Sequence, residues 1–108
     1  MPVITVNSLD EFHHIINQDK LALFDFWAAW CGPCKKISPV YEKLSDVTPN
    51  VEFYKINVEE QPEIIEEVSI RGMPTFMAFK SGKKMCEILG SNPENLKLLL
   101  NCDTKRFS

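Results

Sequence analysis

Two cysteines separated by a Gly-Pro dipeptide, Cys31 and Cys34, are the residues of this sequence best suited to chemistry. Thiolates are the nucleophiles of thiol-disulfide exchange. The pair follows an apolar run that predicts a buried strand, and it begins a predicted helix. Two intervening residues keep both side chains within disulfide reach across the first helical turn. Free N–H groups and the helix dipole stabilise a negative sulfur there. The spacing therefore predicts a dithiol that exchanges with disulfides of other molecules.

The two cysteines are expected to act in order. Cys31, nearer the N-terminus, is predicted to be the exposed thiol that attacks a target disulfide and forms a mixed disulfide. Cys34, inside the first turn, is predicted to be more buried and to release the reduced target by attacking Cys31. The exchange needs no bound cofactor, but another reductant must reopen the resulting disulfide.

A zinc site is the main alternative for the pair, and the rest of the sequence does not favour it. A structural zinc ion takes four ligands. His13 and His14 are adjacent on a predicted helix and so face different directions, while Cys86 and Cys102 are isolated in the sequence. We expect Cys86 and Cys102 to be small apolar packing residues. Cys102 is the better candidate of the two for regulatory oxidation.

Composition and charge exclude several classes of protein. The 108 residues carry 12 basic and 15 acidic side chains, and neither sign runs in a block. We therefore expect no nucleic-acid or anionic-membrane partner. No apolar run reaches the length of a membrane span, and no secretory signal is visible at the N-terminus. We expect a monomeric, cytoplasmic protein with a single domain over residues 1–102 and a loose tail over 103–108.

The hydrophobic pattern predicts nine elements in the order β-α-β-α-β-α-β-β-α. Strands are expected near 4–6, 21–27, 51–58, 75–80 and 84–89, and helices near 8–16, 33–47, 61–68 and 92–100. Alternating strands and helices indicate parallel pairing, and the last two strands form an antiparallel hairpin. Ser8 and Glu11 have capping-box spacing, and Pro39 interrupts the second helix and should kink it. The fold class is α/β.

Asp25 is the most informative residue outside the cysteine pair. It shares a face of the strand 21–27 with Leu21, Leu23 and Trp27, so its side chain should be buried. An unpaired buried carboxylate is costly, and desolvation raises its pKa toward the working pH. Such a group beside a reactive dithiol predicts acid-base chemistry.

Several motifs in the right order resemble the thioredoxin family, over about Val3 to Leu100. They are Trp30-Cys31-Gly32-Pro33-Cys34-Lys35, Phe24-Asp25-Phe26-Trp27, Pro39, Arg71-Gly72-Met73-Pro74-Thr75-Phe76, Gly82 and Gly90. The resemblance implies a thioredoxin fold, with a mixed five-stranded sheet flanked by four helices. It also implies a protein-disulfide reductase that serves electron transport and cell redox homeostasis.

The resemblance assigns roles to further residues. Asp25 would accept the proton of Cys34, and Lys55 would moderate the pKa shift of Asp25. The Met73–Pro74 bond would be cis, and the Met73 backbone would bond to an extended target segment. The expected apolar contact surface around Cys31 consists of Trp30, Gly32, Pro33, Met73 and Gly90, beside Pro74.

The resemblance also implies partners. NADPH would supply electrons through thioredoxin reductase, and targets would include peroxiredoxins, methionine sulfoxide reductases and ribonucleotide reductase. Two other readings stay open. One is a disulfide oxidase or isomerase of the same fold. Such proteins resemble one another in a C-G-H-C or C-P-H-C motif at the cysteine pair, and Pro33 stands here in place of the histidine, which argues against this class. A redox-switched binding or scaffold subunit would use the apolar surface alone.

Overall fold

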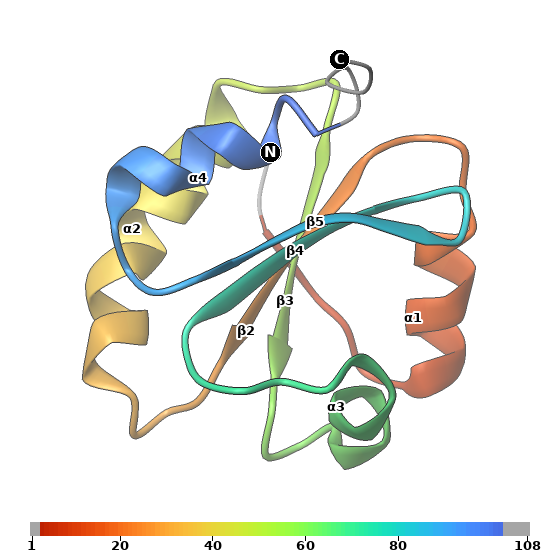
Figure 1. The fold of residues 1–108 in the computed structure, drawn as a ribbon, viewed down its shortest axis with the longest axis horizontal. Coiled ribbons are helices and arrows are strands. Elements are labelled where there is room, and N and C mark those ends of the chain that lie inside the picture. Colours follow the sequence, from red (N-terminus) through yellow and green to blue (C-terminus); the bar gives the residue numbers. More distant parts are fainter. Residues whose placement is uncertain (1–2, 103–108) are drawn as a thin grey trace.

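The computed structural model describes residues 3–102, and the predicted tail at 103–108 lies outside them. Within this range the elements follow the predicted order (Figure 1). The strands are β1 (Ile4–Thr5), β2 (Ala22–Trp27), β3 (Glu52–Asn57), β4 (Thr75–Lys80) and β5 (Lys83–Leu89). The helices are α1 (Leu9–Ile16), α2 (Gly32–Asp46), α3 (Pro62–Val68) and α4 (Pro93–Leu99).

The five strands form one mixed sheet in the order β1-β3-β2-β4-β5. β1 and β2 both pair with β3 in parallel, while β4 pairs antiparallel with β2 and with β5. The predicted mixed α/β sheet is confirmed. β2 is central, and its near-continuous apolar run is what a strand covered by helices on both faces requires.

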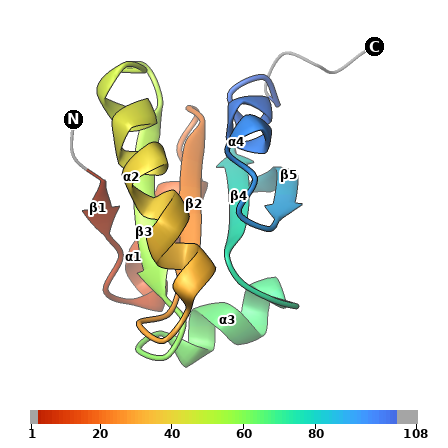
Figure 2. The same cartoon turned by 90° about the vertical axis from the view of Figure 1, so that its left-hand side faces the viewer.

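Helices cover both faces of the sheet. α1 and α3 lie on one side, and α2 and α4 lie on the other (Figures 1 and 2). Phe12, Phe24 and Ile64 belong to the core on the first side, and Leu23 and Leu99 belong to the core on the second. No helix among residues 3–102 is long and apolar enough to cross a membrane.

Local hydrogen bonds fix the helix starts near the predicted positions. Ser8 Oγ accepts the N–H of Glu11 at 3.1 Å, and Glu11 Oε1 accepts the N–H of Asn7 at 2.7 Å. Asn92 Oδ1 accepts the N–H of Glu94 at 3.0 Å, at the start of α4. The N–H groups of Glu11 and Glu94 are donors that the helices themselves leave unpaired.

Candidate active site

Cys31 and Cys34 lie where the chain passes from β2 to α2, and they form a disulfide with a Cα–Cα distance of 5.3 Å. Cys31 is the N-cap of α2, and its Sγ accepts the N–H of Cys34 at 3.1 Å. One free N–H group of the first helical turn, that of Cys34, therefore points at this sulfur. The same arrangement stabilises a Cys31 thiolate once the disulfide is reduced.

The predicted exposure of Cys31 is wrong for the disulfide form. Cys31 is 4% exposed and Cys34 is 2% exposed. Both pack with Ala28, and Trp27, Val58 and Met73 lie against the three. Contacts from these separate segments cover the sulfurs, and the position of Cys31 in the sequence does not reveal them.

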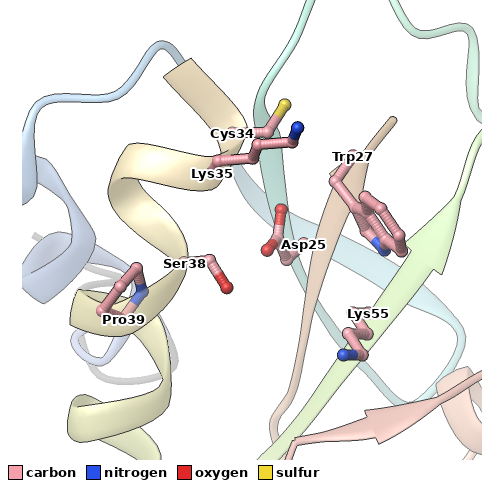
Figure 3. Close-up of a pocket in the computed structure, with 7 residues that line it drawn as sticks. All are labelled: Asp25, Trp27, Cys34, Lys35, Ser38, Pro39 and Lys55. Atoms are coloured by element: carbon pink, nitrogen blue, oxygen red, sulfur yellow. The ribbon is translucent and has the colours of Figure 1, made fainter. Parts of the chain in front are cut away.

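Asp25 lines a cavity of about 250 Å³ beside the cysteine pair. Its lining residues come from β2, α2 and β3: Asp25, Trp27, Cys34, Lys35, Ser38, Pro39 and Lys55. Figure 3 shows the Asp25 carboxylate between α2 and the neighbouring strands, with Cys34 and Lys35 at one end of the cavity. Asp25 is 4% exposed, and its Oδ1 has no hydrogen-bond partner within residues 3–102. The predicted burial of Asp25 is confirmed.

Burial raises the pKa of Asp25 to about 7, because desolvation disfavours the charged carboxylate. The positive charge of Lys55 lowers this pKa, and the negative charge of Glu42 raises it. Lys55 Nζ lies 6.0 Å from the ring centroid of Trp27. A carboxyl group that titrates near neutral pH, in the same cavity as Cys34, can take up or release a proton during exchange.

A second hollow, of about 390 Å³, lies on the surface beside the pair. It is lined by Trp30, Val58, Ile65, Ile70, Arg71, Gly72 and Met73. Trp30 is 65% exposed, as predicted, and its Nε1 donates to Glu59 Oε2 at 2.8 Å. The structure thus brings Trp30 and Met73 to one surface, and Gly32 and Pro33 are exposed on the first turn of α2.

The loop before β4 has the conformation that the resemblance implies. The Met73–Pro74 peptide bond is cis, and Pro74 is buried. Gly90 adopts a positive φ of 115°, a conformation that favours glycine, and its N–H donates to the Pro74 carbonyl at 2.9 Å. Half-buried Met73 precedes this fixed segment and packs against the cysteine pair.

Sequence reasoning missed three residues near the site. Ser38 lines the cavity of Asp25, and its spacing of four residues from Cys34 on a helix is a signal that could have placed it there. Glu42 follows Ser38 by another four residues and acts on Asp25 through its charge. Glu59 bonds to Trp30, and its sequence position offers no such signal.

Cys86 and Cys102 are also closer than the sequence suggests. Both pack against the core between the sheet and α4, as predicted. They are not isolated, however, because the structure joins them as a second disulfide. Among residues 3–102, no three His, Cys, Asp or Glu side chains gather as a metal site.

Comparison with known proteins identifies the family. The thioredoxin family model matches residues 3–101. Thioredoxin of Malassezia sympodialis is 49% identical over 98 residues, 88% of this chain and 92% of the relative. Thioredoxin-1 of Saccharomyces cerevisiae is 41% identical over 95 residues, 88% of this chain and 92% of the relative. The crystal structure of the Malassezia sympodialis protein superposes with a TM-score of 0.90 at 46% identity, covering 94% of this chain and 92% of that one. The chain therefore belongs to the thioredoxin family of protein-disulfide oxidoreductases, with Cys31 and Cys34 as its redox pair.

Proposed function

We propose that Cys31 is the attacking thiolate and Cys34 the resolving thiol of a protein-disulfide reductase. The observation that carries this assignment is the position of the Cys31 sulfur. It caps α2 and accepts the N–H of Cys34, so the helix N-terminus favours its charged form. Cys34 lines the cavity that contains Asp25, whereas Cys31 does not.

The proposed reaction proceeds in two exchange steps. The Cys31 thiolate attacks one sulfur of the target disulfide, forms a mixed disulfide and expels the other target sulfur as a thiolate. Cys34 passes its proton to the Asp25 carboxylate and attacks the Cys31 sulfur, which releases the second target thiolate. The target gains two electrons, and the chain is left with the Cys31–Cys34 disulfide. Lys55 tunes the step by lowering the pKa of Asp25.

Target docking is proposed at the surface that borders the pair. Exposed Trp30 and half-buried Met73 offer apolar area there, and the exposed Gly32 and Pro33 border the buried Cys31. An extended target segment would bond to the Met73 backbone, held by Pro74 and Gly90. A shallow apolar surface suits a protein that docks many partners weakly.

The proposed electron donor is thioredoxin reductase with NADPH, and the proposed targets are peroxiredoxins, methionine sulfoxide reductases and ribonucleotide reductase. One similar yeast structure concerns thiol resolution in a mitochondrial 1-Cys peroxiredoxin through the glutathione and thioredoxin systems, which supports the first target class. We propose a single domain over residues 1–102, acting as a cytoplasmic monomer. One of the relatives is a mitochondrial thioredoxin, so the mitochondrion is the alternative compartment. Cell fractionation distinguishes a cytoplasmic from a mitochondrial location.

A coupled assay tests the role assignment. Insulin reduction is followed in the presence of NADPH and thioredoxin reductase, with Cys86→Ser as the control variant. Cys31→Ser should lower turnover by at least about a thousandfold, since it removes the nucleophile. Cys34→Ser should accumulate a mixed disulfide between Cys31 and the target. Trapping of the target on Cys34 in the Cys31→Ser variant would instead reverse the two roles.

A further inference from the structure

The second pair of cysteines, Cys86 and Cys102, lies at a junction between two elements. Cys86 is on the edge strand β5, opposite Ala78 of β4. Cys102 follows α4, and its N–H donates to the Leu99 carbonyl at 3.4 Å. Each cysteine therefore lies on an element with backbone contacts of its own.

The backbone geometry suits a covalent link. The Cα atoms of Cys86 and Cys102 are 6.1 Å apart, inside the range that disulfides span without backbone movement. A shift in the register of β4 and β5 lies beside the pair. Ala78 pairs with Cys86, whereas Phe79 pairs with Lys84, so Met85 is the extra residue of a bulge. Cys86 packs on the same core cluster as Leu99 and Cys102.

The pair is separate from the Cys31–Cys34 disulfide. Through the sheet register, Cys86 lies beside Ala78, and Ala78 lies beside Leu23 near the start of β2. Cys31 follows the other end of β2. Figure 2 shows the end of α4 and the β2–α2 connection at opposite ends of the molecule. Exchange requires contact between sulfurs, so the two pairs of one folded molecule cannot exchange directly.

We propose that Cys86 and Cys102 are a second redox site, which a small disulfide of the glutathione type oxidises and which then fastens the end of α4 to β5. This site is independent of the proposed function of Cys31 and Cys34. Cys86 is half-buried, whereas Cys102 is only 6% exposed, so Cys86 is the more accessible residue of the two. Cys86 is therefore the attacking thiol and Cys102 the resolving one.

Oxidation takes two balanced steps. The Cys86 thiolate attacks one sulfur of glutathione disulfide, forms a mixed disulfide and releases one glutathione thiolate. The Cys102 thiolate then attacks the Cys86 sulfur, forms the Cys86–Cys102 bond and releases the second glutathione. Two electrons and two protons pass from the cysteines to two glutathione molecules, and excess reduced glutathione reverses both steps.

The bond adds a covalent constraint to a noncovalent contact. Leu96 and Leu99 hold α4 to the sheet by apolar packing, and among the strands that the structure describes β5 is an edge strand paired with β4 alone. A link between residues 16 apart restricts the unfolded chain. For a domain of this size, such a restriction raises the melting temperature by roughly 10 °C.

The test uses the full chain with Cys31→Ser and Cys34→Ser, so that only the second pair can react. The folded protein is equilibrated with graded ratios of reduced and oxidised glutathione, quenched in acid and alkylated. Mass spectrometry should show that Cys86 and Cys102 become protected from alkylation at the same glutathione ratio. The two residues should then be found in one disulfide-linked peptide whose mass is lower by two hydrogens than that of the separate peptides. The oxidised protein should melt roughly 10 °C above the reduced one.

The reduced and oxidised forms of one chain give the main comparison, so no substitution at the pair is required. Cys86→Ser and Cys102→Ala serve as controls. In either variant, the melting temperature with glutathione disulfide should stay within about 2 °C of the melting temperature of the same variant without it. Both thiols staying alkylatable at every ratio would overturn the proposal, as would a glutathione adduct on Cys86 without a link. A linked peptide with an unchanged melting temperature would overturn the fastening of α4.

Discussion

Asp25 and Lys55 are register partners on the parallel strands β2 and β3, at the centre of the sheet. The pairing places a cation beside a carboxylate that is almost fully buried. The pKa of Asp25 nevertheless rises to about 7, because desolvation outweighs the attraction of Lys55. The site thus holds a carboxyl group that titrates near neutral pH, at a cost in stability.

Asp25→Asn should stabilise the protein at pH 8 by up to about 4 kcal/mol and have little effect at pH 4. In the folded state the pKa of Asp25 is about 7, and in the unfolded state it is near 3.8. Between these values the folded state binds more protons, so stability falls as pH rises and stays lowered above pH 7. Urea unfolding at both pH values measures the effect.

The control is Glu60→Gln, which removes an exposed carboxylate from the loop after β3. It should change stability by less than about 0.5 kcal/mol at both pH values. An Asp25→Asn effect of equal size at pH 4 and pH 8 would contradict the argument, since it would reflect packing and not titration.

Lys55→Gln should move the pH profile of target reduction upward by about half a unit to one unit. Removing the cation removes the influence that lowers the pKa of Asp25, so the carboxylate form becomes populated only at higher pH. The measurement is the rate of Cys34 attack on a mixed disulfide between pH 5.5 and about 9, by stopped flow.

Lys36→Gln provides the matched control, because Lys36 is exposed on α2 and does not line the cavity. Its profile should stay at the parent position. A downward shift in Lys55→Gln would show that Lys55 acts on another group of the site.

Much of the fold follows from local patterns. The apolar run from Leu21 to Trp27 favours a strand covered on both faces, and this segment forms the central strand β2. Ser8 and Pro93 mark helix starts through hydrogen-bonding and backbone rules that act within a few residues. The position of Asp25 on β2 predicts its burial for the same reason.

Contacts between distant segments set the parts of the site that the sequence does not predict. Cys31 is covered by Val58 and Met73, which reach it from other loops. Cys86 meets Cys102 only because a bulge in β5 and the end of α4 fall together. These contacts depend on how whole helices and strands pack together, so they cannot be predicted from the spacing of residues along the chain.

Glu59→Ala should lower the kcat/KM for target reduction about two- to fivefold while changing stability by less than about 1 kcal/mol. Glu59 holds the exposed Trp30 indole through a 2.8 Å hydrogen bond, and its loss frees a side chain of the proposed docking surface. Insulin reduction and urea unfolding measure the two effects. Glu60→Ala is the neighbouring control, and an equal loss in both variants would point to charge and not to the Trp30 contact.

Tyr41→Phe should lower the free energy of unfolding by about 1 to 2 kcal/mol. The buried Tyr41 hydroxyl donates to the Tyr54 carbonyl at 2.8 Å and ties α2 to β3, so the substitution removes a donor inside the core. The ring contacts of Tyr41 with Phe53 and Phe76 remain in the variant, which limits the change to the hydrogen bond. Tyr54→Phe removes a hydroxyl that bonds to partly exposed Glu52, and it should cost less than about 1 kcal/mol. Urea unfolding of both variants at pH 7 measures the difference, and a larger loss in Tyr54→Phe would contradict the role of the Tyr41 hydroxyl.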